Sequence, residues 1–351
     1  MPILIDRGAS GSWIYATGRT RAASPQKIRE AGARSLDIGL INNMPDSALE
    51  STEREFLKLL DSSAGDLFVR LRLYALPDVP RGEQGRQHLQ NSYSGVGDLW
   101  DDRCDGLIVT GTEPRASNLM DEPYWVTLTE VLEWAEEAAV STVWSCLAAH
   151  AAVLHMDGIV RHALADKRFG VFEHARVSDH PVLEGVPSPL RVPHSRWNEL
   201  PEDALTSCGY VVLTRSATAG VDMFLKQQRS LAIFFQGHPE YESETLLREY
   251  RRDIGRYLRK ERMTYPAVPE GYVDEGTTRL LMAFRERAMT DRREDLLAEF
   301  PAAVASAQCM NSWRSAASHI YRNWLSGLLE RKSWQSKSAR PREGLRSTTT
   351  R

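Results

Sequence analysis

Short apolar runs alternate with amphipathic helical patterns along the chain from residue 36 onwards. The runs are short and end at turn-forming residues, which is typical of strands buried in a sheet. The predicted strands are Leu36–Ile41, Phe68–Tyr74, Gly106–Thr110, Val140–Ser145, Gly170–Val177, Tyr210–Thr214 and Ser230–Phe235. Helical spacing predicts helices around Phe56–Leu60, Tyr124–Glu137, Leu147–Leu154 and Ser243–Leu258. This alternation favours an α/β fold with a mostly parallel sheet flanked by helices.

The two ends of the chain lack this pattern. Residues 1–34 are polar and rich in Arg, Gly and Ser, and we expect an irregular N-terminal arm there. Residues 35–330 are expected to form a single α/β domain, with helical additions after about residue 265. Residues 331–351 contain seven basic residues and one acidic residue, which predicts a disordered tail.

Composition narrows the class of protein. With 351 residues, 42% hydrophobic and 26% charged, the chain can bury a large core and is not disordered as a whole. The formal net charge of −3 offers no basic excess for nucleic-acid binding, so small molecules or proteins are the expected partners. The most apolar stretch, Ala138–Met156, is interrupted by polar residues and is expected in the core, not in a membrane.

The cysteines and the N-terminus indicate the compartment. The four cysteines are widely spaced and form no CxxC pair, so neither a metal site nor a dense disulfide framework is expected. The N-terminus carries charges where a secretory signal would be apolar. A cytoplasmic protein with reduced thiols is therefore predicted.

Cys146 lies where a predicted strand gives way to a predicted helix. The free N–H groups at a helix N-terminus favour a negatively charged sulfur, and the thiolate is the reactive form of cysteine. Taken alone, an unpaired cysteine is more often a small buried apolar residue than a nucleophile. Cys146 therefore needs a base nearby before it indicates catalysis.

The segment from Gln236 to Glu240 supplies such a base. It directly follows the strand Ser230–Phe235, so parallel strands would bring it to the same sheet edge as Cys146. His238 can accept the thiol proton and return it to a leaving group, while Glu240 can orient the imidazole. The three residues together predict a Cys-His-Glu triad.

A third loop follows the strand Gly106–Thr110. Gly111 lets backbone N–H groups approach a ligand closely, and with Thr112 it could form an oxyanion hole. An ordinary βα turn explains the same residues equally well.

Several ordered motifs resemble the homoserine O-succinyltransferase family, whose fold is similar to that of class I glutamine amidotransferases. The resemblance spans about residues 36–325 and rests on motifs spaced as in that family. These motifs are Asp105–Gly111, Tyr124–Trp125, Cys146, Glu173–His174, Pro193–Arg196, Gly237–Tyr241, Ser312–Arg314 and Asn323–Leu325.

The resemblance implies an acyltransferase of methionine biosynthesis. Cys146 would attack an acyl-CoA thioester, His238 would act as general base and acid, and Glu240 would orient it. The acyl group would then pass to the hydroxyl of L-homoserine. The family's substrate-contacting residues fall on Lys167, Ser195 and Arg252. Acyl-CoA would be a consumed co-substrate, so neither a cofactor nor a metal is implied.

One loop departs from the family pattern and bears on the donor. The position that tunes the choice between succinyl and acetyl donors falls on Arg115. An arginine there could pair with the free carboxylate of a succinyl group, which favours succinyl-CoA. After Met44–Pro45, Asp46 and Ser47 replace the basic residues usual in the family.

Other functions stay open at this stage. The donor could be acetyl-CoA and the acceptor serine, because one methylene changes selectivity by only about 1–3 kcal/mol. A glutaminase would use the same triad, although its cysteine usually lies between glycines, unlike Cys146. A non-catalytic binding protein of the same fold is the third alternative. Family members are often homodimers, and the late helices with Trp313 and Trp324 offer a surface for such a contact.

Overall fold

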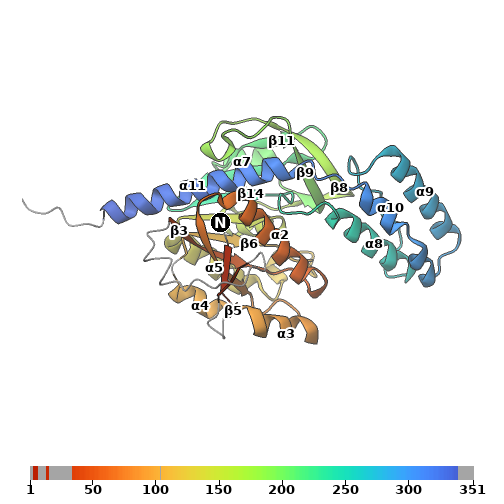
Figure 1. Cartoon of the computed structure of the whole chain (residues 1–351), viewed down its shortest axis with the longest axis horizontal. Coiled ribbons are helices and arrows are strands. Elements are labelled where there is room, and N and C mark those ends of the chain that lie inside the picture. The colour runs from red at the N-terminus through yellow and green to blue at the C-terminus, as the bar shows by residue number, and fades with distance from the viewer. Residues whose placement is uncertain (1–2, 7–12, 16–33, 103, 339–351) are drawn as a thin grey trace, which may run out of the picture.

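A mostly parallel sheet, with antiparallel strands towards its two ends, forms the centre of the molecule (Figure 1). The computed structural model describes residues 3–6, 13–15, 34–102 and 104–338. The strand order is β10-β13-β14-β7-β6-β3-β4-β1-β2, and β5 pairs with β4. The strands are β1 (Ile3–Asp6), β2 (Trp13–Tyr15), β3 (Ser35–Ile41), β4 (Phe68–Ala75), β5 (Ser94–Gly95), β6 (Gly106–Val109), β7 (Ser141–Ser145), β10 (Val211–Val212), β13 (Met223–Gln227) and β14 (Leu231–Phe235). The predicted mostly parallel α/β fold is confirmed.

Helices cover both faces of this sheet because its strands are apolar on both sides. One face packs against α2 (Asp46–Ala64) and the long α11 (Arg314–Ser338), which lie against each other. The other face packs against α4, α5, α6 and α7. The helices on and around that face are α3 (Glu83–Ser92), α4 (Val96–Asp101), η2 (Leu119–Asp121), α5 (Trp125–Ala138), α6 (Leu147–Asp157) and α7 (Glu202–Ser207).

Both predicted ends contain more structure than their composition indicated. Within residues 1–34, β1 pairs in parallel with β4, and its Ile3 and Leu4 are fully buried. This short apolar segment was not predicted as a strand because most of the residues around it are polar. Within residues 331–351, α11 continues to Ser338, and Lys332 donates to Asp105 over 2.6 Å. The expected irregular arm and disordered tail are wrong for these parts, and residues 339–351 lie outside the described residues.

A second, antiparallel sheet lies beside the central one. It contains β8 (His162–Arg176), β9 (Leu190–Glu199), β11 (Thr214–Ser216) and β12 (Gly220–Val221), in the order β12-β11-β8-β9. The predicted strand 170–177 is part of β8, whereas the predicted strand 210–214 divides between β10 and β11. The β8–β9 hairpin carries Lys167 and Ser195, and its register shifts between Ala163 and Arg168.

The helices between β14 and α11 form a lobe with its own apolar core, at the right of Figure 1. Its elements are α8 (Thr245–Leu258), α9 (Glu275–Thr290), η4 (Glu294–Glu299) and α10 (Ala302–Ala307). The short helix η3 (Pro181–Leu183) is not part of the lobe and packs against α11. Tyr250 and Tyr257 on α8 pack into this core together with Phe169 of β8. The lobe therefore supports α8 on one side, and the opposite side of α8 is free to face a ligand. No helix within the described ranges is long and apolar enough to span a bilayer.

Candidate active site

A cavity of about 540 Å³ opens at the carboxyl ends of β6, β7 and β14. The central sheet, the β8–β9 hairpin and α8 all contribute to its walls. The predicted site residues that line it are Gly111, Thr112, Cys146, Lys167, Ser195, His238, Glu240 and Arg252. Arg115 is the one predicted site residue that does not. The parallel topology thus brings together side chains that lie far apart in sequence.

Cys146 occupies the sharp turn between β7 and α6. Its backbone has φ 52° and ψ −113°, a conformation that residues with a Cβ rarely adopt. Its N–H donates to the carbonyl of Phe235 over 2.7 Å, which holds the turn against β14. Strain of this kind persists only where the surroundings impose it, and it is concentrated at functional sites. The turn places the sulfur in the cavity at the N-terminus of α6.

The pairing of β14 with β7 brings His238 to this sulfur. The strands are parallel, with Phe235 opposite Ser145, so the segments that follow them leave the sheet side by side. His238 Nδ1 lies 2.8 Å from Glu240 Oε1, and the ring also interacts with Cys146. Since Glu240 occupies Nδ1, Nε2 is the nitrogen that faces the sulfur. His238 and Glu240 are 6% and 3% exposed, so this pair is shielded from water.

The charge state of His238 follows from these neighbours. Burial by itself lowers the pKa of a histidine, but the negative charges of Cys146 and Glu240 outweigh it and raise the pKa of His238 well above its ordinary value. Tyr241 stacks on the ring with centroids 4.2 Å apart and covers its face. The site therefore holds a histidine of raised pKa between the sulfur of Cys146 and the carboxyl group of Glu240.

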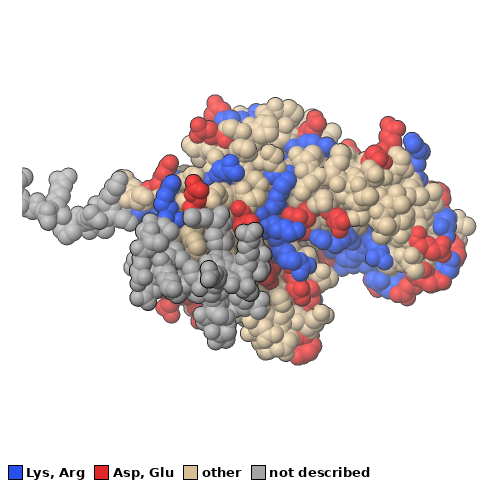
Figure 2. Space-filling model, in the orientation of Figure 1, with Lys and Arg blue, Asp and Glu red and all other residues tan. Residues whose placement is uncertain are grey.

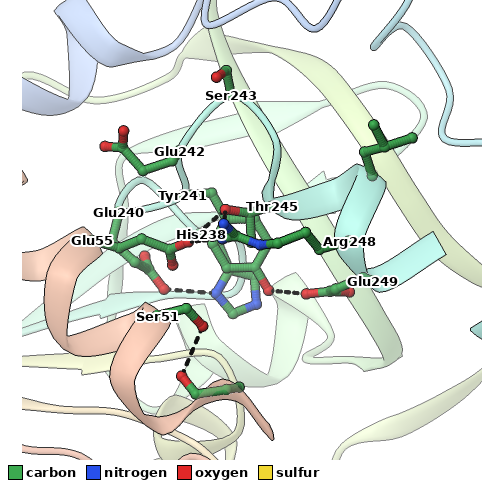
Figure 3. A network of polar contacts seen from close by, with 12 residues as sticks. Ser51, Glu55, His238, Glu240, Tyr241, Glu242, Ser243, Thr245, Arg248 and Glu249 are labelled. Carbon is green, nitrogen blue, oxygen red and sulfur yellow. Dashed lines mark hydrogen bonds and ion pairs between the residues drawn. The ribbon is translucent and has the colours of Figure 1, made fainter. Parts of the chain in front are cut away.

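Glu55 is a buried acid beside the triad that sequence reasoning missed. It reaches the site from α2, and Figure 3 shows its carboxyl group next to that of Glu240. Thr245 Oγ1 donates to Glu55 over 2.5 Å and Arg248 over 2.8 Å. Burial, reinforced by the charge of Glu240, raises the pKa of Glu55 to about 7. A signal was present, because Glu55 adjoins Phe56 and Leu59 in the apolar pattern of this helix.

Glu55→Gln should change how stability depends on pH. Folded Glu55 holds its proton more tightly than unfolded Glu55, so the wild type loses stability as pH rises from about 4.5 through about 7. The shift in the pKa of Glu55 corresponds to at most about 3 kcal/mol of stability. The amide introduced by Glu55→Gln does not ionise, so the variant keeps this stability as pH rises. Urea unfolding at pH 5 and pH 8 should show a smaller decline for Glu55→Gln than for the wild type. Glu50→Gln, an exposed change on the same helix, should decline like the wild type.

Gly111 allows the loop after β6 to approach the nucleophile turn closely. A Cβ at Gly111 would lie 2.7 Å from the Cβ of Leu147 and 2.9 Å from its backbone nitrogen. Leu147 is the first residue of α6, where N–H groups lack an intrahelical partner. Asn43 fixes the loop, since its N–H donates to Thr110 Oγ1 over 2.8 Å. The Leu147 N–H and the Gly111–Thr112 backbone can together receive a developing oxyanion.

Gly111→Ala should therefore impair catalysis at Cys146 strongly. The methyl group would push the loop away from Leu147, and loss of one oxyanion donor lowers kcat by about 10²–10³-fold in other acyl-transfer enzymes. Steady-state kinetics should show the loss mainly in kcat. A Gly97→Ala variant is the matched control, because a Cβ there meets no atom within 4 Å. An unchanged kcat in Gly111→Ala would contradict this role for the loop.

The three predicted substrate contacts gather around two acids of α8. Lys167 Nζ lies 3.2 Å from Asp253 and 3.6 Å from Glu249, and Arg252 lies 3.1 Å from Asp253. Ser195 Oγ donates to Glu249. Burial raises the pKa values of Glu249 and Asp253, but Lys167 and Arg252 more than compensate and hold both low. The wall therefore presents ionised carboxylates interleaved with cations.

Arg115 lies outside the wall of the cavity. It is exposed to solvent. Buried Glu122 accepts the backbone N–H groups of Arg115 and Ala116 over 2.6 and 2.7 Å, which fixes this part of the loop. Glu113 lines the cavity instead and pairs with Arg256 over 2.8 Å. An ungapped reading of the loop could not foresee this contact.

The matching family model and the most similar relatives by sequence agree on one family. The family model described as homoserine O-succinyltransferase matches residues 2–332. A homoserine O-succinyltransferase of Rhodopseudomonas palustris is 48% identical over 300 residues, covering 86% of this chain and 90% of that protein. One from Bradyrhizobium japonicum is 42% identical, covering 89% and 98%. A glutamine amidotransferase structure from Methylobacillus flagellatus superposes with a TM-score of 0.47 at 16% identity, covering 84% of this chain and 95% of that one.

Proposed function

The chain belongs to the homoserine O-succinyltransferase family, and on this premise we propose that it transfers the succinyl group of succinyl-CoA to the hydroxyl of L-homoserine. The observation that carries the proposal is the contact between the strained Cys146 turn and the buried His238–Glu240 pair. An activated thiolate beside an imidazolium is the arrangement that acyl transfer through a covalent thioester requires.

In the first half-reaction, the Cys146 thiolate attacks the carbonyl carbon of succinyl-CoA. A carbon–sulfur bond forms, and the carbonyl oxygen becomes an oxyanion held by the Leu147 N–H and the Gly111–Thr112 backbone. The intermediate collapses as the bond to the CoA sulfur breaks. His238 gives its proton to that leaving sulfur, which yields free CoA and succinylated Cys146.

In the second half-reaction, the neutral imidazole of His238 removes the proton from the homoserine hydroxyl. The oxygen attacks the thioester carbonyl, and the same donors hold the second oxyanion. Collapse expels the Cys146 thiolate and releases O-succinylhomoserine. The imidazolium–thiolate pair is then restored for the next turnover, with Glu240 fixing the ring throughout.

The α8 wall suits the acceptor because an α-amino acid carries both charges. The carboxylate of homoserine can displace the acidic partners of Lys167 and Arg252, which would hold it by charge-assisted hydrogen bonds. Its ammonium group would find Glu249 or Asp253 within the same wall. The patch therefore matches a zwitterion more closely than it matches a simple anion.

Intact mass spectrometry tests the proposal in two stages. Incubation with succinyl-CoA should add one succinyl group to the wild type and none to Cys146→Ala. Addition of L-homoserine should then discharge the adduct and produce O-succinylhomoserine. Absence of an adduct, or an adduct that homoserine does not discharge, would contradict the proposal. Glutamine hydrolysis without acyl transfer would instead indicate an amidotransferase-type activity.

A further inference from the structure

Arg161 differs from the other cations of the cavity. Six lysine and arginine side chains line the cavity within the described part of the chain: Arg161, Lys167, Arg196, Arg252, Arg256 and Arg262. Five of them are satisfied by protein groups. Lys167, Arg252 and Arg262 pair with Asp253, Arg256 pairs with Glu113, and Arg196 donates to the carbonyl of Asn198. Among the described residues, Arg161 has neither an ion-pair nor a hydrogen-bond partner.

The surroundings of Arg161 favour a negatively charged ligand. Burial disfavours its charge and lowers its pKa, while Tyr124, Cys146 and Glu122 oppose that effect, in this order of strength. A half-buried cation without a counter-ion has lost part of its hydration, and no ion pair or hydrogen bond compensates for that loss. A carboxylate placed against it would restore the balance through charge-assisted hydrogen bonds.

Two neighbours of Arg161 bear on the binding of an anion. One is a hydrogen-bond donor for the anion, and the other is an acid that could compete with it for Arg161. The Tyr124 hydroxyl is buried and has no hydrogen-bond partner in the described part of the chain. Glu122 is a nearby acid whose Oε1 accepts two backbone N–H groups of the 115–116 loop, while its buried Oε2 has no hydrogen-bond partner in the described part of the chain. It forms no ion pair with Arg161 among the described residues, so it leaves the guanidinium available.

The position of Arg161 identifies which anionic group fits. Arg161 and Cys146 line the same cavity. The free carboxylate of a succinyl thioester lies three carbon–carbon bonds from the reacting carbonyl, within reach of a cation so placed. The CoA phosphates lie beyond the long pantetheine arm, and the homoserine carboxylate is accommodated at the α8 wall. The succinyl carboxylate is the remaining anion.

We propose that Arg161 binds the free carboxylate of the succinyl group and thereby selects succinyl-CoA over acyl donors without a second carboxylate. The proposal rests on the proposed function and names a specificity residue within it. It also gives the role once expected of Arg115 to a residue that the fold places inside the cavity.

Arg161→Met tests the proposal through donor preference. The donors compared are succinyl-CoA and butyryl-CoA, which has the same four-carbon chain but ends in a methyl group. Loss of a hydrogen bond to a charged group corresponds to about a 10- to 100-fold decrease in kcat/KM for succinyl-CoA. Acylation by butyryl-CoA should stay within about twofold of the wild type, since its methyl group makes no ion pair. Arg161→Lys keeps the charge and should recover part of the preference.

Arg115→Gly is the matched control, because it removes an equal charge from the exposed loop and should leave the preference unchanged. Equal losses with both donors in Arg161→Met, or no loss with either, would overturn the proposal. So would a shift of preference in Arg115→Gly that equals the shift in Arg161→Met. Failure of the proposed function is distinguishable, because the wild type itself would then form no dischargeable succinyl adduct.

Discussion

Cys146→Ala is expected to lower kcat/KM for succinyl transfer by about 10⁴-fold or more. Removing the nucleophile of a covalent triad has an effect of this size because no other group can form the acyl-enzyme. The backbone donors near Gly111 and Leu147 would remain, so weak residual catalysis by binding and oxyanion stabilisation is the most that can survive. Steady-state kinetics with intact-mass analysis would measure both the lost turnover and the lost adduct.

Two further variants make the result for Cys146 specific. Cys208→Ala removes another free, half-buried thiol that is absent from the cavity wall, and it should retain wild-type activity. Cys146→Ser keeps the size of the side chain but replaces the thiol with a hydroxyl that ionises far less readily. It should fold normally and transfer the succinyl group very slowly. Turnover close to the wild-type rate in Cys146→Ala would show that the cavity works without a covalent step.

The parallel core and the placement of Cys146 and His238 in one cavity were accessible from sequence for the same physical reason. Buried strands such as Gly106–Thr110 and Ser230–Phe235 produce unmistakable apolar runs, and parallel strands end at one edge. Any reactive residues that directly follow two such strands are brought together. Cys146 and His238 satisfy this condition, so their contact needed no knowledge of loops or side-chain packing.

Other parts of the site could not be found in this way. The strand β9 carries buried polar residues such as His194 and Arg196, and Pro193 interrupts its pattern, so no alternation marked it as a strand. Arg161 follows a helix and resembles an ordinary surface cation in sequence. The path of the loop at Arg115 depends on Glu122, whose carboxylate acts on backbone groups seven residues earlier. These features depend on tertiary contacts that local composition does not encode.

His238→Gln should lower kcat/KM by about 10³–10⁴-fold, the upper part of the range for loss of general acid–base catalysis. The amide can accept a hydrogen bond in the same place, but it cannot carry the thiol proton to the leaving CoA sulfur. The charge that supports the Cys146 thiolate is lost with it. His162→Gln, at an exposed position absent from the cavity wall, should retain wild-type kinetics.

The pH profile of Glu240→Gln shows whether Glu240 sets the charge of His238 or only supports the fold of the loop. In the wild type, the negative charges of Cys146 and Glu240 hold the pKa of His238 well above its ordinary value, so the imidazolium needed to protonate CoA persists to high pH. Removing the Glu240 charge leaves burial less opposed, and the pKa of His238 should fall. The basic limb of the kcat/KM profile for succinyl-CoA should therefore move to lower pH in Glu240→Gln. A lower rate with an unmoved basic limb would mean that Glu240 supports the fold of the loop but does not set the charge of His238.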